Sequence, residues 1–142
     1  MRKARREVDR SSRAVAVIGA SMDRAKFGNK AVRAYKEAGY TVWPVNPRAE
    51  TIEGLHVYND LDSLPALPHR ASIYLPEEAA LEALDRLAEL EERYGKQITA
   101  VYLNPGVDTD AVLERAIEHD LNAHPVCSIR AIGRTPEEFG DE

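Results

Sequence analysis

The sequence predicts an α/β fold in which a doubly wound, mostly parallel sheet is flanked by helices within a single domain. Two observations predict it. Short runs rich in β-branched residues alternate with segments that have apolar residues at helical spacing. The short runs are apolar on both faces, as the central strands of a parallel sheet are. The length of 142 residues is typical of one domain, and a chain of this size buries roughly 70% of its unfolded surface.

The first half of the chain contains four segments with a strand or helix pattern, at 14–18 (strand), 29–38 (helix), 41–45 (strand) and 55–58 (short strand). Gly39 is expected to end the helix, because glycine readily takes the left-handed conformation that follows many helices. Pro44 and Pro47 place the second strand at a sheet edge or mark its end. A polar connection is expected at 46–54, and a weak helical turn near 61–64.

The second half repeats the alternation, with strands at 71–75, 98–103 and 123–127 and helices at 77–94 and 109–119. The long helix carries Leu81, Leu84 and Leu87 on its inner face. Glu77 and Glu78 near its start suit the positive end of the helix dipole. Right-handed crossovers between parallel strands then give a Rossmann-like domain. We assign this domain to residues 14–130 and expect a tail at 131–142.

Composition excludes several classes of protein. The 44% hydrophobic and 30% charged content is that of a soluble globular protein. No apolar run approaches the roughly 20 residues of a membrane helix, and the polar start is unlike a secretory signal. The single cysteine, Cys127, excludes an internal disulfide framework and agrees with a reducing compartment. These features predict a cytoplasmic protein that does not interact with membranes.

The charge is unevenly distributed along the chain. Six basic and two acidic residues lie in the basic N-terminal extension 1–13, which leaves 13 basic and 22 acidic residues, a net charge of −9, in 14–142. An acidic body argues against nucleic acid as the main partner. We interpret the extension as a solvated, partly helical arm, with a tail that binds nucleic acid or an acidic partner as the alternative.

The predicted fold places four loops around one crevice, at 19–28, 46–48, 75–77 and 104–106. In open parallel sheets, ligands bind beyond the carboxyl ends of the strands, where the strand order reverses. The first loop begins Gly19-Ala20-Ser21 after a buried strand and leads to a helix N-terminus, whose free N–H groups favour phosphate. The fingerprint G-x-G-x-x-G is absent, since only Gly19 and Gly28 are present. A tight turn without a ligand is therefore the alternative.

The end of the second strand indicates which nucleotide would fit. NAD sites usually have a carboxylate there, whereas this chain has Asn46, Pro47 and Arg48. A guanidinium suits a ribose that carries its own phosphate, so NADP and coenzyme A both stay open, unless Arg48 is an ordinary surface arginine. Lys26 could reach a pyrophosphate or simply be exposed. Phe27 could cover an adenine, although anchoring the loop in the core is the commoner role.

These motifs make the chain similar to the CoA-binding domain family, small single-domain CoA-binding proteins related to the nucleotide-binding domain of the succinyl-CoA synthetase alpha subunit. The resemblance covers about residues 14–130. It rests on VAVIGAS at 15–21, KFG at 26–28, AGYTVWPVNPR at 38–48, GLHVY at 54–58 and VYLNPGV at 101–107. The combination of GAS, PVNP and a strand ending in NPG at these separations is fairly specific.

The resemblance implies a Rossmann-like domain with coenzyme A as its cofactor. It places the pyrophosphate at Gly19, Ala20 and Ser21, with Lys26 nearby. It places the adenosine 3′-phosphate beside Asn46, Pro47 and Arg48, and lines the crevice with Pro76, Asn104, Pro105 and Gly106. The chain departs from the family pattern at two points. Pro125-Val126 precedes Cys127 where many members have Asp-Arg, and the strand ending Ile73-Tyr74-Leu75-Pro76 lacks the Phe-Arg often found there.

No catalytic or metal-binding set assembles from the sequence. The four histidines, His56, His69, His119 and His124, are scattered, and Ser21 lacks an identifiable base and a nucleophile elbow. His119 in the last turn of a helix suits the helix dipole. His124 and Cys127 lack a second pair of ligands for zinc, so Cys127 is either a reactive thiol or a small buried hydrophobe.

The sequence therefore predicts a cytoplasmic protein that binds coenzyme A or acyl-CoA without evident catalysis. An NADP-dependent oxidoreductase and a regulatory protein-interaction module are the alternatives. The succinyl-CoA synthetase subunit, as the resemblance implies, uses a phosphorylated histidine from a further domain, and residues 14–142 offer no such domain. A protein partner or assembly with a second copy of the chain stays open.

Overall fold

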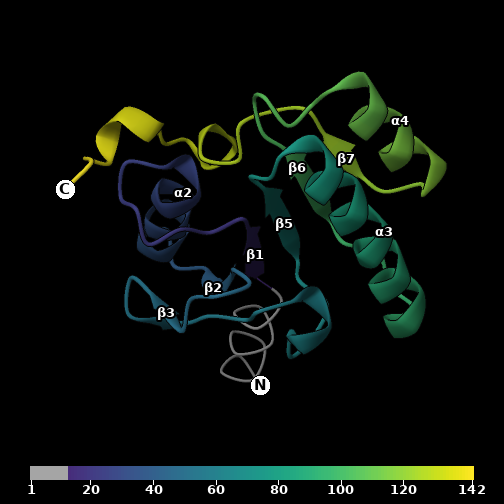
Figure 1. The fold of residues 1–142 in the computed structure, drawn as a ribbon, viewed down its shortest axis with the longest axis horizontal. Coiled ribbons are helices and arrows are strands. Elements are labelled where there is room, and N and C mark those ends of the chain that lie inside the picture. Colours follow the sequence, from purple (N-terminus) through teal and green to yellow (C-terminus); the bar gives the residue numbers. More distant parts are fainter. Residues whose placement is uncertain (1–12) are drawn as a thin grey trace, which may run out of the picture.

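Five parallel strands form the central sheet of the protein, and the computed structural model describes residues 13–142. The strands lie in the order β2-β1-β5-β6-β7 (Figure 1). Their bounds are β1 Ala14–Ile18, β2 Thr41–Val45, β5 Arg70–Ile73, β6 Ala100–Leu103 and β7 Ala123–His124. Every neighbouring pair is parallel, which confirms the predicted fold class. Residues 1–12 of the extension expected at 1–13 lie outside the described residues.

Helices cover both faces of this sheet (Figure 1). The helices are α2 (Phe27–Glu37), α3 (Glu77–Tyr94) and α4 (Asp110–Glu118). Alternate residues of β1 point to opposite faces, so Val15 and Val17 pack in the core on the α2 side. Ala16 and Ile18 pack in the core against α3 and α4. The central strand is therefore buried throughout, as its run of apolar residues predicts.

The strand register aligns the carboxyl ends of the four longer strands. Ile18 lies beside Val45 on one side and Ile73 on the other, and Ile73 lies beside Leu103. The chain moves from β1 outward to β2 and then returns to place β5 on the opposite side of β1. This reversal of strand order is the point at which parallel sheets form a crevice. The loops that follow β1, β2, β5 and β6 consequently emerge along one edge.

The segment after β2 differs from its prediction as a polar connection followed by a strand at 55–58. It forms an antiparallel hairpin of β3 (Thr51–Ile52) and β4 (Leu55–His56) outside the main sheet. Glu53 and Gly54 at the turn both have positive φ, 50° and 76°, as two-residue hairpins require. Ile52 is buried against the core on the α2 side. The hairpin turn was missed because glutamate is an unusual residue at a positive φ.

Other boundaries shift by a few residues. α2 begins at Phe27 rather than at residue 29, and the predicted strand at 123–127 ends at His124. The predicted turn at 61–64 is a 3₁₀ helix, η1 (Leu61–Ser63).

The segment expected as a tail at 131–142 contains ordered structure. Short 3₁₀ helices, η2 (Arg130–Ile132) and η3 (Pro136–Glu138), lie on the α2 side of the sheet. Phe139 is only 4% exposed and packs in the same core as Ile129. This segment therefore packs on the domain through the buried side chains of Pro136 and Phe139.

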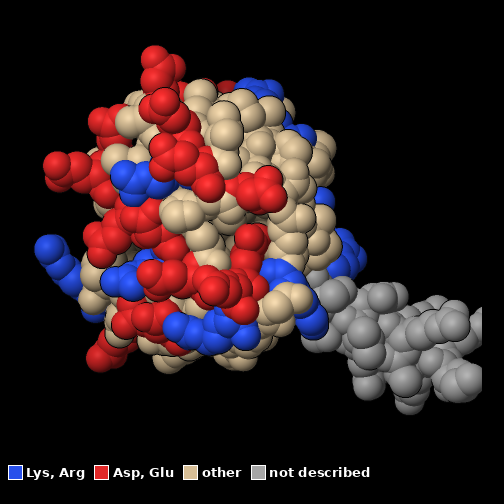
Figure 2. All heavy atoms as spheres, turned by 90° about the vertical axis from the view of Figure 1, so that its right-hand side faces the viewer, with Lys and Arg blue, Asp and Glu red and all other residues tan. Residues whose placement is uncertain are grey.

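The α3 and α4 side of the molecule is strongly acidic (Figure 2). Exposed carboxylates from both helices gather there, including Glu77, Glu78, Glu82, Glu89, Glu92, Glu114 and Glu118. This distribution follows the negative charge that the sequence assigns to the body of the protein. Across residues 13–142, no helix has both the length and the apolar character needed to span a membrane.

Candidate functional site

Two glycines determine how closely the β1 to α2 loop approaches its neighbours. Gly19 has φ +93°, and a Cβ there would lie 2.1 Å from the carbonyl oxygen of Tyr74 at the end of β5. A Cβ on Gly28 would lie 2.3 Å from the carbonyl oxygen of Gly19. Any larger side chain would force these backbone segments apart. The close helix-to-strand packing that the last glycine of the dinucleotide fingerprint provides is thus supplied here by Gly28.

The N-terminus of α2 is the strongest candidate for a phosphate site. The helix begins after Lys26 with no side-chain cap, so its first N–H groups have no capping acceptor from a side chain. Uncapped N–H groups and the positive end of the dipole together favour an anion. The amides of Gly19 and Ala20 instead donate to the carbonyl oxygen of Val45 at 3.1 and 3.2 Å. The turn therefore shapes the crevice, and the donors left for an anion are the amides of Phe27 and Gly28, because the Asn29 amide already donates to the Lys26 carbonyl oxygen at 3.0 Å.

The loop between Gly19 and α2 is held by its own hydrogen bonds. The Ser21 hydroxyl accepts from the Asp23 amide at 3.0 Å, and the Asp23 carboxylate accepts from the Ala25 amide at 3.0 Å. The buried Asn29 side chain donates to the carbonyl oxygen of Ser21 at 2.9 Å. These contacts fix the loop at the edge of the crevice before any ligand binds.

Asn46 joins the loops that follow β1 and β2. Its Nδ2 donates to the carbonyl oxygen of Ala20 at 2.9 Å, and its Oδ1 accepts from the amides of Arg48 and Ala49. An ionised aspartate could not make the donation to Ala20, which gives a structural reason for the missing carboxylate. The Arg48 side chain is exposed beside this turn. At the end of β2, the Asn46 side chain therefore holds the two loops together, while the Arg48 guanidinium is accessible to a ligand.

A first cavity of about 300 Å³ opens beside this turn. Gly19, Val45 and Pro47 form one wall, and α3 forms the opposite wall. The remaining lining comes from Ile18, Asn59, Asp60, Leu61, Asp62, Leu75, Ala79, Glu82, Ala83 and Arg86. Asp60 caps η1, and hydrogen bonds from the Ser63 hydroxyl and amide hold the pKa of its carboxyl below the usual range. The cavity thus combines apolar side chains with the carboxylates of Asp60, Asp62 and Glu82.

A second cavity of about 180 Å³ lies on the other side of Tyr74. Its lining consists of Phe27, Tyr74, Asn104, Pro105, Cys127, Arg130, Pro136 and Glu137. Phe27 is 57% exposed, so the interpretation of Phe27 as a core anchor is wrong. Cys127 is half-buried, whereas His124 is exposed with its ring centroid 6.1 Å from that of Tyr102. Among residues 13–142, no three metal-ligating side chains cluster.

A buried hydrogen-bond network supports the second cavity. Asn104 donates to the Ser72 hydroxyl at 3.0 Å and to the carbonyl oxygen of Ile73 at 2.8 Å, and accepts from the Ser128 amide at 2.8 Å. The Ser128 hydroxyl lies 2.6 Å from that of Ser72 and 3.1 Å from that of Tyr74. Burial raises the pKa of Tyr74 to about 12. Its hydroxyl is therefore protonated near neutral pH and able to donate a hydrogen bond.

The predicted site residues lie in different parts of this region. Gly19 and Pro47 line the first cavity, and Phe27, Asn104 and Pro105 line the second. Ala20, Ser21 and Asn46 shape the connecting turns. Lys26 and Arg48 are exposed, Pro76 precedes α3, and Gly106 has φ +94° in the turn after β6.

Sequence reasoning missed two sets of residues. Tyr74 and Ser128 come from segments far apart in the chain, and only the polar tyrosine at the end of an apolar strand gave a signal. The turn near 61–64 was expected, but the place of segment 59–62 in the lining of the first cavity was not.

The chain is similar to known proteins in both sequence and fold. The model of a family described as CoA binding domain matches residues 13–132. The alpha subunit of acetate–CoA ligase (ADP-forming) II from Pyrococcus furiosus is 35% identical over 78 residues, 54% of this chain and 17% of that subunit. This chain therefore spans only a small part of its curated relative.

Solved structures share the fold. A protein from Thermus thermophilus is 22% identical with a TM-score of 0.73, over 93% of this chain and 96% of that one. The dinucleotide-forming acetyl-coenzyme A synthetase 1 of Ca. Korarchaeum cryptofilum in its apo form is 24% identical with a TM-score of 0.62. That match covers 82% of this chain and 27% of the synthetase. At these identities the likeness concerns the fold.

Proposed function

The chain belongs to the CoA-binding domain family, and from this premise we propose that it binds coenzyme A or an acyl-CoA at the carboxyl edge of its sheet. One observation carries the proposal. The uncapped N-terminus of α2 lies at the strand reversal, with a cavity on either side of Tyr74 and the loop after β1. A ligand with a central pyrophosphate and a different group at each end suits this arrangement.

In this proposal the adenosine end occupies the first cavity. Its apolar side chains are suited to a base, and a carboxylate such as Asp60 can accept a hydrogen bond from an exocyclic amino group. Arg48, exposed on the neighbouring turn, would pair with the 3′-phosphate. The same guanidinium would suit the 2′-phosphate of NADP, so NADP is the competing ligand to test.

The pantetheine arm occupies the second cavity in this proposal. Phe27 and Pro105 offer apolar surface, while Tyr74 and Asn104 supply polar groups. Cys127 would then stand near the thiol or thioester. We propose no bond-making step for the chain itself, so the protein acts as a cytoplasmic carrier, sensor or partner subunit. Incubation with acetyl-CoA should leave the thioester intact, and hydrolysis above the buffer rate would contradict this part of the proposal.

Ligand-induced stabilisation tests the proposal directly. Coenzyme A at about 100 times its Kd should stabilise the folded protein by about 2.7 kcal/mol, which raises Tm by about 10 °C for a chain of this size. Coenzyme A should stabilise more than NADP, NADPH or NAD. Absence of a thermal shift with coenzyme A at millimolar concentration would exclude the proposed function, and a larger shift with NADPH would favour the oxidoreductase alternative.

A further inference from the structure

Residues 133–142, here called the strap, lie beyond the part of the chain that the family model matches. Phe139 anchors the strap in the core on the α2 side, and the guanidinium groups of Arg33 and Arg134 lie 5.7 and 5.0 Å from the centre of its ring. Thr135 and Glu138 form a capping box that fixes the turn before it. The strap therefore has a defined path across the protein.

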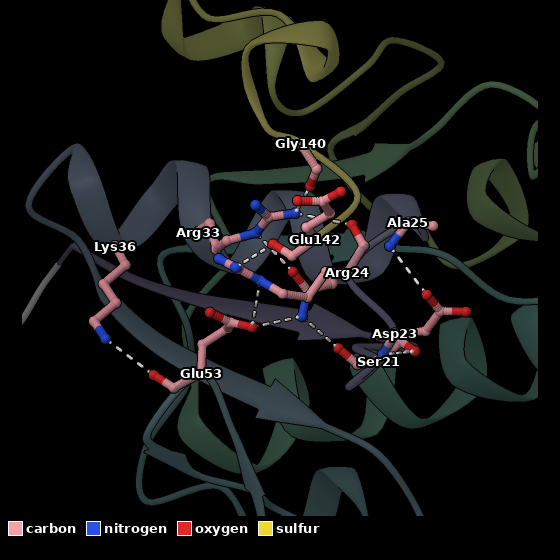
Figure 3. Close-up of polar contacts among 10 residues, drawn as sticks. Ser21, Asp23, Arg24, Ala25, Arg33, Lys36, Glu53, Gly140 and Glu142 are labelled. Carbon is pink, nitrogen blue, oxygen red and sulfur yellow. Dashed lines mark hydrogen bonds and ion pairs between the residues drawn. The ribbon is translucent and has the colours of Figure 1, made fainter.

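The end of the strap contacts three cations of the β1 to α2 region, of which Arg24 and Arg33 are labelled in Figure 3. Arg33 donates to the carbonyl oxygen of Gly140 at 2.8 Å, and Arg24 donates to that of Glu142. Lys30, whose side chain is only 12% exposed, pairs with Asp141 at 2.9 Å. The acidic end of the strap thus lies against positive charge, although 67% of the Asp141 side chain stays exposed to solvent.

These cations belong to the same structural unit as the candidate phosphate site. Lys30 is in the first turn of α2, with its ammonium 5.7 Å from the centre of the Phe27 ring. Arg24 lies within the loop that follows Gly19, and its carbonyl oxygen accepts from Arg33. The strap also reaches the second cavity, because Pro136 and Glu137 form part of its wall. Strap and candidate ligand site therefore share one region of the surface.

The Arg24 guanidinium is incompletely satisfied. Its Nε is buried and has no hydrogen-bond acceptor among the described residues, with the Glu53 carboxylate 3.3 Å away. Glu53 also accepts from Asn29, so it is shared between two donors. The rest of the Arg24 side chain is accessible, with 41% of its surface exposed, so its guanidinium can also meet a phosphate oxygen, which is a charged acceptor.

We propose that the strap is an autoinhibitory element whose acidic end competes with ligand phosphates for Lys30 and Arg24. This inference rests on the proposed function. The carboxylate of Asp141 neutralises Lys30 and repels an approaching polyanion such as coenzyme A. Binding of the ligand then weakens the contacts between the strap and α2. By thermodynamic reciprocity, removal of the Asp141 charge strengthens ligand binding.

The test compares Asp141→Asn with wild type in the full chain, with the Kd for coenzyme A measured by titration calorimetry. Asp141→Asn is expected to lower this Kd by about two- to five-fold at about 0.1 M ionic strength, where the screening length is about 10 Å. The gain should shrink at about 1 M, where that length is about 3 Å. Glu114→Gln, which removes one negative charge from the exposed face of α4, is the matched control and should change the Kd less.

Hydrogen exchange gives an independent readout. Saturating coenzyme A should accelerate exchange of the amides of 133–142 in the wild type, and should do so less in Asp141→Asn. Equal affinities for Asp141→Asn and Glu114→Gln would overturn the inference while leaving coenzyme A binding intact. Weaker binding by Asp141→Asn would also overturn it, because the strap would then support the ligand. If neither the wild type nor a variant bound coenzyme A, the proposed function would fail and this inference with it.

Discussion

The two cavities at the carboxyl edge of the sheet are built in different ways. The second rests on hydrogen bonds among buried side chains that come from distant parts of the chain, chiefly Asn104, Ser72 and Ser128. The first is rimmed by exposed groups held by local contacts, such as Asp60 with Ser63. Stability and ligand affinity should therefore respond differently to substitutions at the two cavities. Their shared boundary, Gly19 against Tyr74, should affect both.

Gly19→Ala should have the largest effect, because it acts on that shared boundary. The new Cβ would meet the Tyr74 carbonyl oxygen at 2.1 Å on a backbone that already has φ +93°. We expect a loss of about 3 kcal/mol or more in the free energy of unfolding, measured by urea denaturation. Gly39→Ala is the matched control, since Gly39 has φ +88° with nothing within 4 Å of the added Cβ. The control should cost only about 1–2 kcal/mol. Equal losses would show that the close approach at Gly19 is easily relieved.

Asn104→Ala should show most clearly that the second cavity contributes more to stability than the first. It leaves the Ser128 amide and the Ile73 carbonyl group buried without their side-chain partner. The expected cost is about 2–4 kcal/mol in the free energy of unfolding. Asn59→Ala, at the rim of the first cavity, removes hydrogen bonds from an exposed amide to Asn46 and Ala49 and should cost less than about 1 kcal/mol. Similar losses in the free energy of unfolding from both substitutions would show that the two cavities do not differ in this way.

This difference also explains what the sequence could and could not predict. The strands were predictable because Ala14–Ile18 and its neighbours are apolar on both faces, and parallel strands bring their following loops to one edge. The position of Gly19 at that edge follows from the same pattern. The roles of Gly19 and Ala20 could not be predicted from that pattern. Their amides both donate to the carbonyl oxygen of Val45, which belongs to another strand.

Long-range contacts also limited what could be predicted elsewhere in the chain. The partnership of Ser72 with Ser128 joins residues 56 positions apart, and no local pattern indicates it. The turn at Glu53 escaped prediction for a local reason, since its positive φ suits asparagine or glycine better than glutamate. Periodicity thus predicted the scaffold and the edge where the candidate site lies, whereas the polar network beneath the second cavity required the fold.

Arg48→Ala tests the first cavity through its ligand rather than through stability. Because Arg48 is exposed, its removal should leave the free energy of unfolding within about 0.5 kcal/mol of wild type. If it pairs with the 3′-phosphate, the Kd for coenzyme A should rise by about five- to ten-fold, measured by calorimetry. The Kd for 3′-dephospho-coenzyme A should change much less. Equal losses for the two ligands would place Arg48 away from that phosphate.

The smallest expected effect concerns α3, which lines the first cavity with one face and binds α4 with another. Asp85 on α3 accepts from His119 at 2.6 Å and from Arg115 at 2.8 Å. The hydrogen bond from His119, followed by Arg115, holds the pKa of Asp85 below its usual range. A lowered folded-state pKa contributes stability that is present above the unfolded pKa of about 3.9 and is lost as pH falls through the folded value.

Asp85→Asn should therefore be less stable than wild type at neutral pH, by less than about 1 kcal/mol because the pair is partly exposed. The difference should begin to shrink as pH falls below the unfolded pKa of about 3.9, and should disappear once pH is below the lower folded-state pKa of Asp85. Urea midpoints across this pH range would measure it, with Glu114→Gln on the outer face of α4 as the control. Affinity for coenzyme A at neutral pH should be unchanged, because Asp85 lies outside the lining of both cavities. A pH-independent loss, or a change in affinity, would mean that the α3 to α4 contact shapes the first cavity and is not only a surface ion pair.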